Sequence, residues 1–246
     1  NNDRVNIAQP FVSWNWKAGT TSGLSGGTIT PSSYSINTTS GFGIYKWTGT
    51  GSAGTIAHGL GVVPKMIIVK ALSGAPGGAQ AWSVYHASLG NDKFLVLNAI
   101  DAETTTTTDW NSTSPTDTLF TLGTANRTNA VGGDYIAYVF ADVTGFSKFG
   151  IYSGNGDVDG PMIYTGFRPA WLMVKRKNST SNWTIVDTTR APSNVISIYS
   201  DANLSTTDGS YAGWDIVSNG FKFRNTDAGI NASGGTYIYM AFGQPI

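Results

Sequence analysis

The feature that most constrains the fold of this chain is an internal repeat. The residues FGIY occur at Phe42–Tyr45 and again at Phe149–Tyr152. Three further pairs of segments follow in the same order: HGLGVVPKMIIVK and YTGFRPAWLMVKR, WSVYH and WTIVD, and GGDYIAYVF and GGTYIYMAF. Four matched segments at nearly constant spacing indicate an internal duplication. We therefore expect FGIY to form the first strand of each copy.

The pattern within each copy predicts strands and no helix of useful length. An unbroken apolar run, such as Met66–Val69 after its proline, is typical of a strand that is buried on both faces. The segment YIAYVF alternates and is rich in aromatic residues, and glycine and asparagine recur at strand-length intervals. We predict an all-β fold made of two tandem copies of an antiparallel unit that resembles a β-sandwich or jelly roll.

The domain boundaries follow from the repeat. Copy 1 is expected to span 41–146 and copy 2 to span 147–246, preceded by an N-terminal arm at 1–40. In this arm FVSWNWKAG is predicted to be a strand, and the Gly/Ser/Thr-rich stretch after it is predicted to be a tether. We favour an arm packed on the main body, because Trp14 and Trp16 share one strand face and need cover. The alternative is the last strand of a preceding domain. The chain also begins without Met, which is typical of a processed or truncated piece of a longer protein.

Composition excludes several classes of partner. The formal net charge is +0 and Lys and Arg are scattered singly, so the basic stripe that binds nucleic acid is missing. The chain has no cysteine, which excludes a disulfide framework, a thiolate metal site and a cysteine nucleophile. No apolar run is long enough to span a membrane, so we expect no membrane insertion.

The sequence offers little to support catalysis. The two histidines, His58 and His86, have no partner residues in the spacing of a known catalytic motif, so we interpret both as structural. Glu103 is the only glutamate and lies in a Thr-rich loop, while the aspartates are spread over turns, where they are common in β proteins. A pair of carboxylates suited to glycoside hydrolysis does not stand out. We predict that the chain is not an enzyme.

Two long polar loops differ between the copies, and binding surfaces often lie on such loops. The loop of copy 1 contains Trp110 and Asn111, and the loop of copy 2 ends near Trp214 and Asp215. Because an indole face can stack on the CH face of a sugar, these four residues are the candidate glycan-binding residues. Other tryptophans are expected in the core instead: Trp82, Trp171 and Trp183.

The segment NGDVDG is the one candidate for a metal site. Asn155, Asp157 and Asp159 place oxygen atoms at alternate positions before a glycine, as at the start of a calcium-binding loop. The position at which a bidentate glutamate would close such a loop is Gly166. Calcium is therefore the only cofactor that the sequence suggests, and a plain turn is the alternative that we favour.

Four segments carry a resemblance to a known family: HGLGVVPKMIIVK, YIAYVFADVTGFSKFGIYSGNG, YTGFRPAWLMVKR and SGGTYIYMAF. They resemble a duplicated β domain near the C-terminal ends of tail-fibre and other virion appendage proteins of tailed bacteriophages, particularly marine ones. The resemblance covers most of the chain from about Phe42 onward, and FVSWNWKAG is similar to the segment that leads into this domain. It implies a virion structural protein that associates with other virion proteins. Because fibre proteins are commonly trimers, it also implies a homotrimer. The family supplies no catalytic or binding residues to transfer.

Three functions follow as hypotheses. The first is an adhesion module in which the variable loops contact a polysaccharide or protein of the host surface. The second is a capsid decoration or fibre-shaft protein whose contacts are purely structural. The third is a fragment of a depolymerase, against which the lack of an evident carboxylate pair argues.

Overall fold

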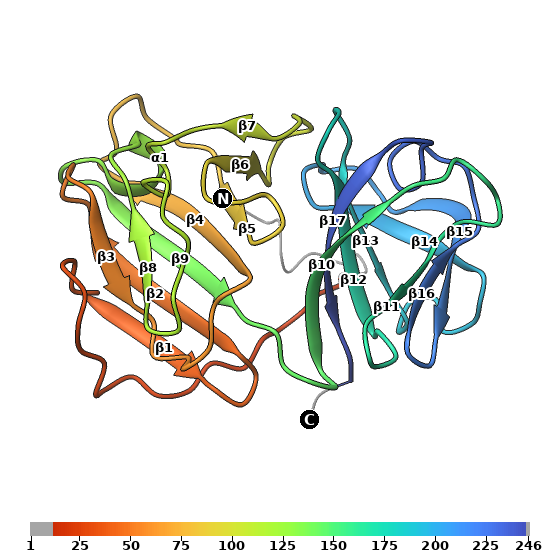
Figure 1. The fold of residues 1–246 in the computed structure, drawn as a ribbon, viewed down its shortest axis with the longest axis horizontal. Coiled ribbons are helices and arrows are strands. Elements are labelled where there is room, and N and C mark those ends of the chain that lie inside the picture. Colours follow the sequence, from red (N-terminus) through yellow and green to blue (C-terminus); the bar gives the residue numbers. More distant parts are fainter. Residues whose placement is uncertain (1–11, 245–246) are drawn as a thin grey trace.

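The computed structural model describes residues 12–244, which form two β lobes side by side (Figure 1). All strand pairs are antiparallel, and the one helix in this part of the chain is the single turn α1 (Asn126–Asn129). The prediction of an all-β, antiparallel fold is confirmed. No helix within the described range is long and apolar enough to cross a membrane.

The first lobe has a large sheet covered by a two-stranded sheet. The large sheet has the order β1-β2-β9-β4-β5-β6-β7, and β3 pairs with β8 in the small one. The bounds are β1 (Ser33–Asn37), β2 (Phe42–Thr48), β3 (Gly54–Ala57), β4 (Met66–Ser73), β5 (Ser83–His86), β6 (Lys93–Val96), β7 (Thr104–Thr105), β8 (Leu119–Leu122) and β9 (Asp134–Phe140).

The second lobe is built from eight strands in the order β10-β17-β12-β13-β14-β15-β16-β11. Side chains from both ends of this order meet in one core, so the strand series folds back over itself. The bounds are β10 (Ser147–Ser153), β11 (Met162–Tyr164), β12 (Trp171–Arg176), β13 (Trp183–Asp187), β14 (Ile196–Asp201), β15 (Gly209–Val217), β16 (Gly220–Phe223) and β17 (Thr236–Phe242).

The strands that carry the matched segments occupy matching places in the two lobes. The two FGIY copies are offset by two residues within their strands, because Phe42 pairs with Phe140 whereas Ser147, and not Phe149, pairs with Phe242. The FGIY strand pairs with the strand that follows Gly-Gly, and that strand pairs with the one that follows the proline. The Trp-led strand comes next. The orders are β2-β9-β4-β5 in the first lobe and β10-β17-β12-β13 in the second. Most residues of the two proline-led strands, β4 and β12, are buried on both faces, as their apolar runs predicted.

The N-terminal segment differs from its prediction in two respects. Residues 12–19 do not form a strand. They are held by side-chain packing and not by pairing with another strand, since Trp16 lies against Trp171 with ring centroids 5.5 Å apart. Residue 11, the first of the predicted strand, lies outside the described residues. The stretch predicted to be a tether instead contains β1, which pairs with β2. The ordered β structure of the first lobe therefore begins before the predicted boundary at residue 41.

A third apolar core joins the two lobes. Along β17, Tyr237, Tyr239 and Ala241 face the core of the second lobe, and Ile238, Met240 and Phe242 face the first lobe. The strand β4 divides in the same way: Ile67 and Val69 belong to the core of the first lobe, and Met66 and Ile68 to the shared core. This alternation follows from the two-residue period of a strand. The large sheets thus pack face to face and bury apolar side chains between them.

Polar contacts also cross between the lobes. The indole Nε1 of Trp183 donates to the carbonyl oxygen of Val96 at 2.8 Å. The carboxylate of Glu103 lies 2.8 Å from the ammonium of Lys177. Burial alone would raise the pKa of Glu103, but its ion pairs with Lys177 and Lys93 lower this pKa overall. The only glutamate of the chain therefore links the two lobes.

Candidate functional site

The two loop tryptophans that were predicted to bind a glycan are buried. Trp110 is 1% exposed and Trp214 is 0% exposed. Trp110 packs edge-on against Tyr85, with its Nε1 donating to the carbonyl of Lys93 at 3.1 Å. Stacking on a sugar needs an open ring face, and neither indole has one. The structure therefore corrects this expectation and places both side chains in the cores of their lobes.

The residues beside these tryptophans do not form a common site. Asn111 is exposed and has a positive φ of 50°. Asp215 is nearly buried, and its Oδ2 accepts a hydrogen bond from Nε of Arg224 at 2.5 Å. The first residue lies in a loop of the first lobe and the second in β15, so the fold does not bring the predicted pairs together.

In the candidate calcium loop, one side-chain oxygen of each of the three residues already has a partner. Oδ1 of Asn155 accepts the amide of Asp157 at 3.0 Å, and Oδ1 of Asp157 accepts the amide of Asp159 at 2.8 Å. Oδ1 of Asp159 lies 2.8 Å from the ammonium of Lys222. Residues 12–244 contain no group of three His, Cys, Asp or Glu side chains arranged to hold a metal. These contacts favour the plain turn.

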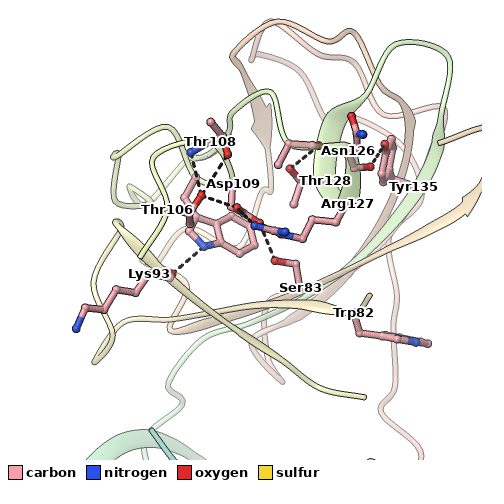
Figure 2. A network of polar contacts seen from close by, with 12 residues as sticks. Trp82, Ser83, Lys93, Thr106, Thr108, Asp109, Asn126, Arg127, Thr128 and Tyr135 are labelled. Carbon is pink, nitrogen blue, oxygen red and sulfur yellow. Dashed lines mark hydrogen bonds and ion pairs between the residues drawn. The ribbon is translucent and has the colours of Figure 1, made fainter. Parts of the chain in front are cut away.

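A network of polar contacts surrounds Asp109, which is 0% exposed. Figure 2 shows the guanidinium of Arg127 directed at this carboxylate, with Nε 2.5 Å from Oδ1 and Nη2 2.7 Å from Oδ2. The hydroxyls of Ser83 and Thr106 donate to the same carboxylate at 3.0 Å and 2.8 Å. With its acceptors occupied in this way, Asp109 fastens the polar loop to α1 and β5. Its role is structural.

Both histidines are buried and use both ring nitrogens. Nδ1 of His58 accepts the amide of Leu60, and Nδ1 of His86 accepts the amide of Ser88 at 3.1 Å. Nε2 of His86 lies 3.3 Å from the carbonyl oxygen of Tyr239 in the other lobe, which fixes the neutral tautomer with its proton on Nε2. Burial lowers the pKa of His58, and it lowers the pKa of His86 to about 4.

The depressed pKa of His86 predicts a loss of stability in mild acid. A histidine in the unfolded chain binds its proton near pH 6.5, whereas folded His86 stays neutral down to about pH 4. Between these values the unfolded chain binds more protons, so the free energy of unfolding should fall by about 3 kcal/mol as the pH drops from 7 to 4. Urea titrations at several pH values measure this. In the variant His86→Gln the free energy of unfolding should depend clearly less on pH. If the pH dependence is the same in both proteins, His86 does not have a depressed pKa.

A cavity lies where the N-terminal segment meets the second lobe. It has a volume of about 760 Å³ and opens beside a more apolar pocket of about 420 Å³ between the two large sheets. Both are of the size that small ligands occupy. We call the larger cavity the tryptophan cleft and define it by these lining residues: Trp14, Trp16, Asn37, Trp171, Asp187, Arg190 and Gln244.

Three indoles form the apolar wall of the tryptophan cleft. Trp14 and Trp16 are half-buried, and both pack edge-on against Trp171, with ring centroids 6.3 Å and 5.5 Å away. Trp16 also contacts Phe242 at the end of β17, with centroids 5.4 Å apart. The cleft therefore lies at the edge of the shared core, where residues from both lobes meet.

The polar wall of the cleft is held rigidly. Nε of Arg190 lies 2.6 Å from Oδ2 of Asp187, and its guanidinium carbon lies 5.3 Å from the ring centre of Trp14. Nη1 of Arg190 donates to Oγ of Ser200 at 2.7 Å. Two buried donors at this cleft, Nη2 of Arg190 and Nε1 of Trp171, have no hydrogen-bond partner among the described residues. An unmade buried hydrogen bond costs about 1–3 kcal/mol, but both atoms are closed off from the space of the cleft.

Comparison with known proteins gives one match. Residues 1–245 match a family described as a domain of unknown function, DUF7483. The chain belongs to the DUF7483 family. No curated protein and no solved structure matches this DUF7483 chain. The family description names no activity.

The residues of the tryptophan cleft were only partly visible in the sequence of this DUF7483 chain. The alternation of Trp14 and Trp16 predicted that these indoles need cover, and they do pack on the main body. Asp187 ends the second Trp-led strand and Arg190 comes just after it, far along the chain. No motif connects the two segments, so only the folded arrangement brings them together.

Proposed function

We propose that this chain is a non-enzymatic structural module of a tailed-bacteriophage appendage, such as a tail fibre, that binds a host-surface polysaccharide. In this proposal three copies form a homotrimer, and the trimer associates with other virion proteins. The resemblance of its repeated segments supports the virion assignment. The observation that carries the binding role is the tryptophan cleft, where half-buried indoles face fixed polar groups.

We also infer that the two lobes are tandem copies of one unit, because a set of buried hydrogen bonds recurs in both. The segment Asn-Ala-x-Gly-Gly-x-Tyr occurs at 129–135 and at 231–237. Both asparagines are 0% exposed. Each side-chain amide bonds to three main-chain groups, in Thr50, Ser52 and Gly123 for Asn129, and in Asn155, Asp157 and Asn225 for Asn231.

The tyrosines of this segment repeat their contacts as well. Each hydroxyl accepts one main-chain amide and donates to one main-chain carbonyl, with Ala130 and Asn126 as partners of Tyr135, and Ala232 and Ala228 as partners of Tyr237. Hydrogen bonds that recur at equivalent positions are better explained by one duplicated unit than by two unrelated lobes of similar topology.

The cleft has the chemistry that a carbohydrate needs. Indoles offer apolar surface to the CH faces of a sugar ring, and a few fixed polar groups then orient its hydroxyls. Asn37 and Gln244 add amide side chains to the lining of the cleft. A neutral polysaccharide segment is thus the ligand class that this cleft favours.

Binding to a panel of bacterial surface polysaccharides tests the adhesive role. We expect one polysaccharide to bind the intact chain and the variant Trp16→Ala to weaken that binding by about tenfold or more, since a stacked aromatic anchor is lost. Trp82→Ala is the matched control, because Trp82 is half-exposed and does not line the cleft. If folded protein binds none of the polysaccharides, or if both variants weaken binding equally, the cleft is not a glycan site. Immunogold labelling spread over the capsid would instead support a decoration or shaft role.

A further inference from the structure

In the first lobe, one extended segment closes two strand edges. We call residues 24–37 the strap. Its last part is β1, which pairs with the outer edge of β2, and the amides of Thr28 and Ile29 both donate to the carbonyl of Thr55 on β3 at 2.9 Å. Ile29 and Ile36 of the strap are 5% and 7% exposed and belong to the core of this lobe. The strap therefore completes both the ladders and the core.

Among the described residues, the equivalent edges of the second lobe have no strand beside them. The strand β10 matches β2, because each pairs with the strand that follows Gly-Gly. The strand β11 matches β3, because each precedes the proline-led strand and pairs with a strand late in its unit. The strands β10 and β11 are the first and last in the order of their sheet. Within residues 12–244 no strand pairs with the outer side of either one. A second strap is therefore missing from the described chain.

The register identifies the backbone groups that face outward. The amide of Gly154 donates to the carbonyl of Gly235. In this antiparallel pair the backbone N–H and C=O groups of every second residue of β10 therefore point to β17, and those of Ile151 and Ser153 point away from it. The same reasoning from the bond between Thr165 and Asn219 places Met162 and Tyr164 of β11 outward. The free edge of β10 begins after Phe149, because the amide of Phe149 already donates to Oδ1 of Asp142 at 2.9 Å.

The side chains beside these edges are apolar and accessible. Ile151 is 47% exposed, Met162 is 44% exposed and Tyr164 is 67% exposed. Exposed strand edges with apolar side chains are sites at which another chain can add a strand. In the first lobe the strap shows which kind of chain fits such a pair of edges: an extended Ser/Thr-rich segment with isoleucines that enter the gap.

We propose that the open side of the second lobe, formed by β10 and β11, binds an extended strap-like segment of a partner protein by strand addition. A flexible segment is the occupant that the structure favours over a second folded copy. The two edges lie in different layers of the lobe, and one extended chain bridges both in the first lobe, whereas the edge strand of another folded lobe reaches only one.

A synthetic peptide with the strap sequence LSGGTITPSSYSINTTS, residues 24–40, tests this on the intact chain. We expect saturable binding by fluorescence anisotropy, and hydrogen exchange should show new protection at 149–153 and 162–164. A peptide N-methylated at the positions of Ile29 and Ser35 keeps its side chains but loses ladder donors, so it should bind about tenfold more weakly or worse. The variant Ile151→Pro removes an outward amide and should weaken binding similarly, with its fold checked by circular dichroism.

Four outcomes would overturn the proposal. The first is the absence of peptide binding, and the second is binding that N-methylation leaves unchanged. The third is protection confined to β2 and β3, which would mean that the peptide displaces the strap of the first lobe. Protection of β10 in the peptide-free protein together with a dimeric mass would show that a second copy covers this edge, and would likewise contradict the assigned occupant. The N-methylated peptide keeps the test valid if Ile151→Pro fails to fold.

Discussion

Replacing Trp183 with alanine should lower the free energy of unfolding by about 4 kcal/mol, the loss typical of removing a large aromatic side chain from a core. Trp183 is 1% exposed and lies in the core shared by the two lobes. Its Nε1 also donates to the carbonyl of Val96 in the first lobe at 2.8 Å, so the variant leaves a cavity and an unpaired carbonyl. Urea denaturation followed by circular dichroism measures the effect.

Trp82→Ala is the matched control, because Trp82 holds the equivalent place in the first lobe. The amides of both residues donate to an asparagine side chain, that of Asn98 for Trp82 and that of Asn203 for Trp183. Trp82 is only half-buried, so its loss should be about 1–2 kcal/mol. Equal losses in the two variants would contradict the conclusion that the lobes depend on a shared core.

Replacing Asp109 with alanine should cost about 3–5 kcal/mol, because it breaks a buried ion pair and leaves one charge without its partner. The carboxylate is 0% exposed and binds the guanidinium of Arg127 through two contacts. Ser83 and Thr106 lose the same acceptor. The midpoint of thermal unfolding and urea titrations report this loss.

The double variant Asp109→Leu with Arg127→Met separates the unpaired charge from the loss of the contact itself. Replacing both partners by apolar groups of similar volume is often close to neutral, so the double variant should be more stable than Asp109→Ala. If Asp109→Ala costs less than about 1 kcal/mol, in the range of an exposed pair, the network in Figure 2 does not fasten the loop.

The all-β fold could be predicted because strand periodicity is a local property of the sequence. The apolar run at 66–69 indicated burial on both faces, and the structure places alternate residues of this run in two different cores. The repeat predicted two tandem copies of one unit, and the strands that carry its segments have the same neighbours in both lobes. The shared core was not specified, because the sequence shows that a face is apolar but does not show what covers it.

The binding residues were harder to predict, because exposure depends on tertiary packing. Trp110 and Trp214 stand at the edges of polar loops, yet both rings turn inward and fill the cores of their lobes. Conversely, the cleft combines Trp14 with Arg190, which are far apart in the chain and belong to no common motif. A polar loop therefore predicts an exposed backbone more reliably than the direction of an aromatic side chain within it.

The most direct test of the binding role is to map where a bound polysaccharide contacts the protein by hydrogen exchange of the intact chain. If the tryptophan cleft is the site, protection should appear at residues 12–17 and 187–190, with little change in the polar loops at 101–118 and 202–212. Protection confined to those loops would contradict the account and would return the binding site to the variable loops of the two lobes.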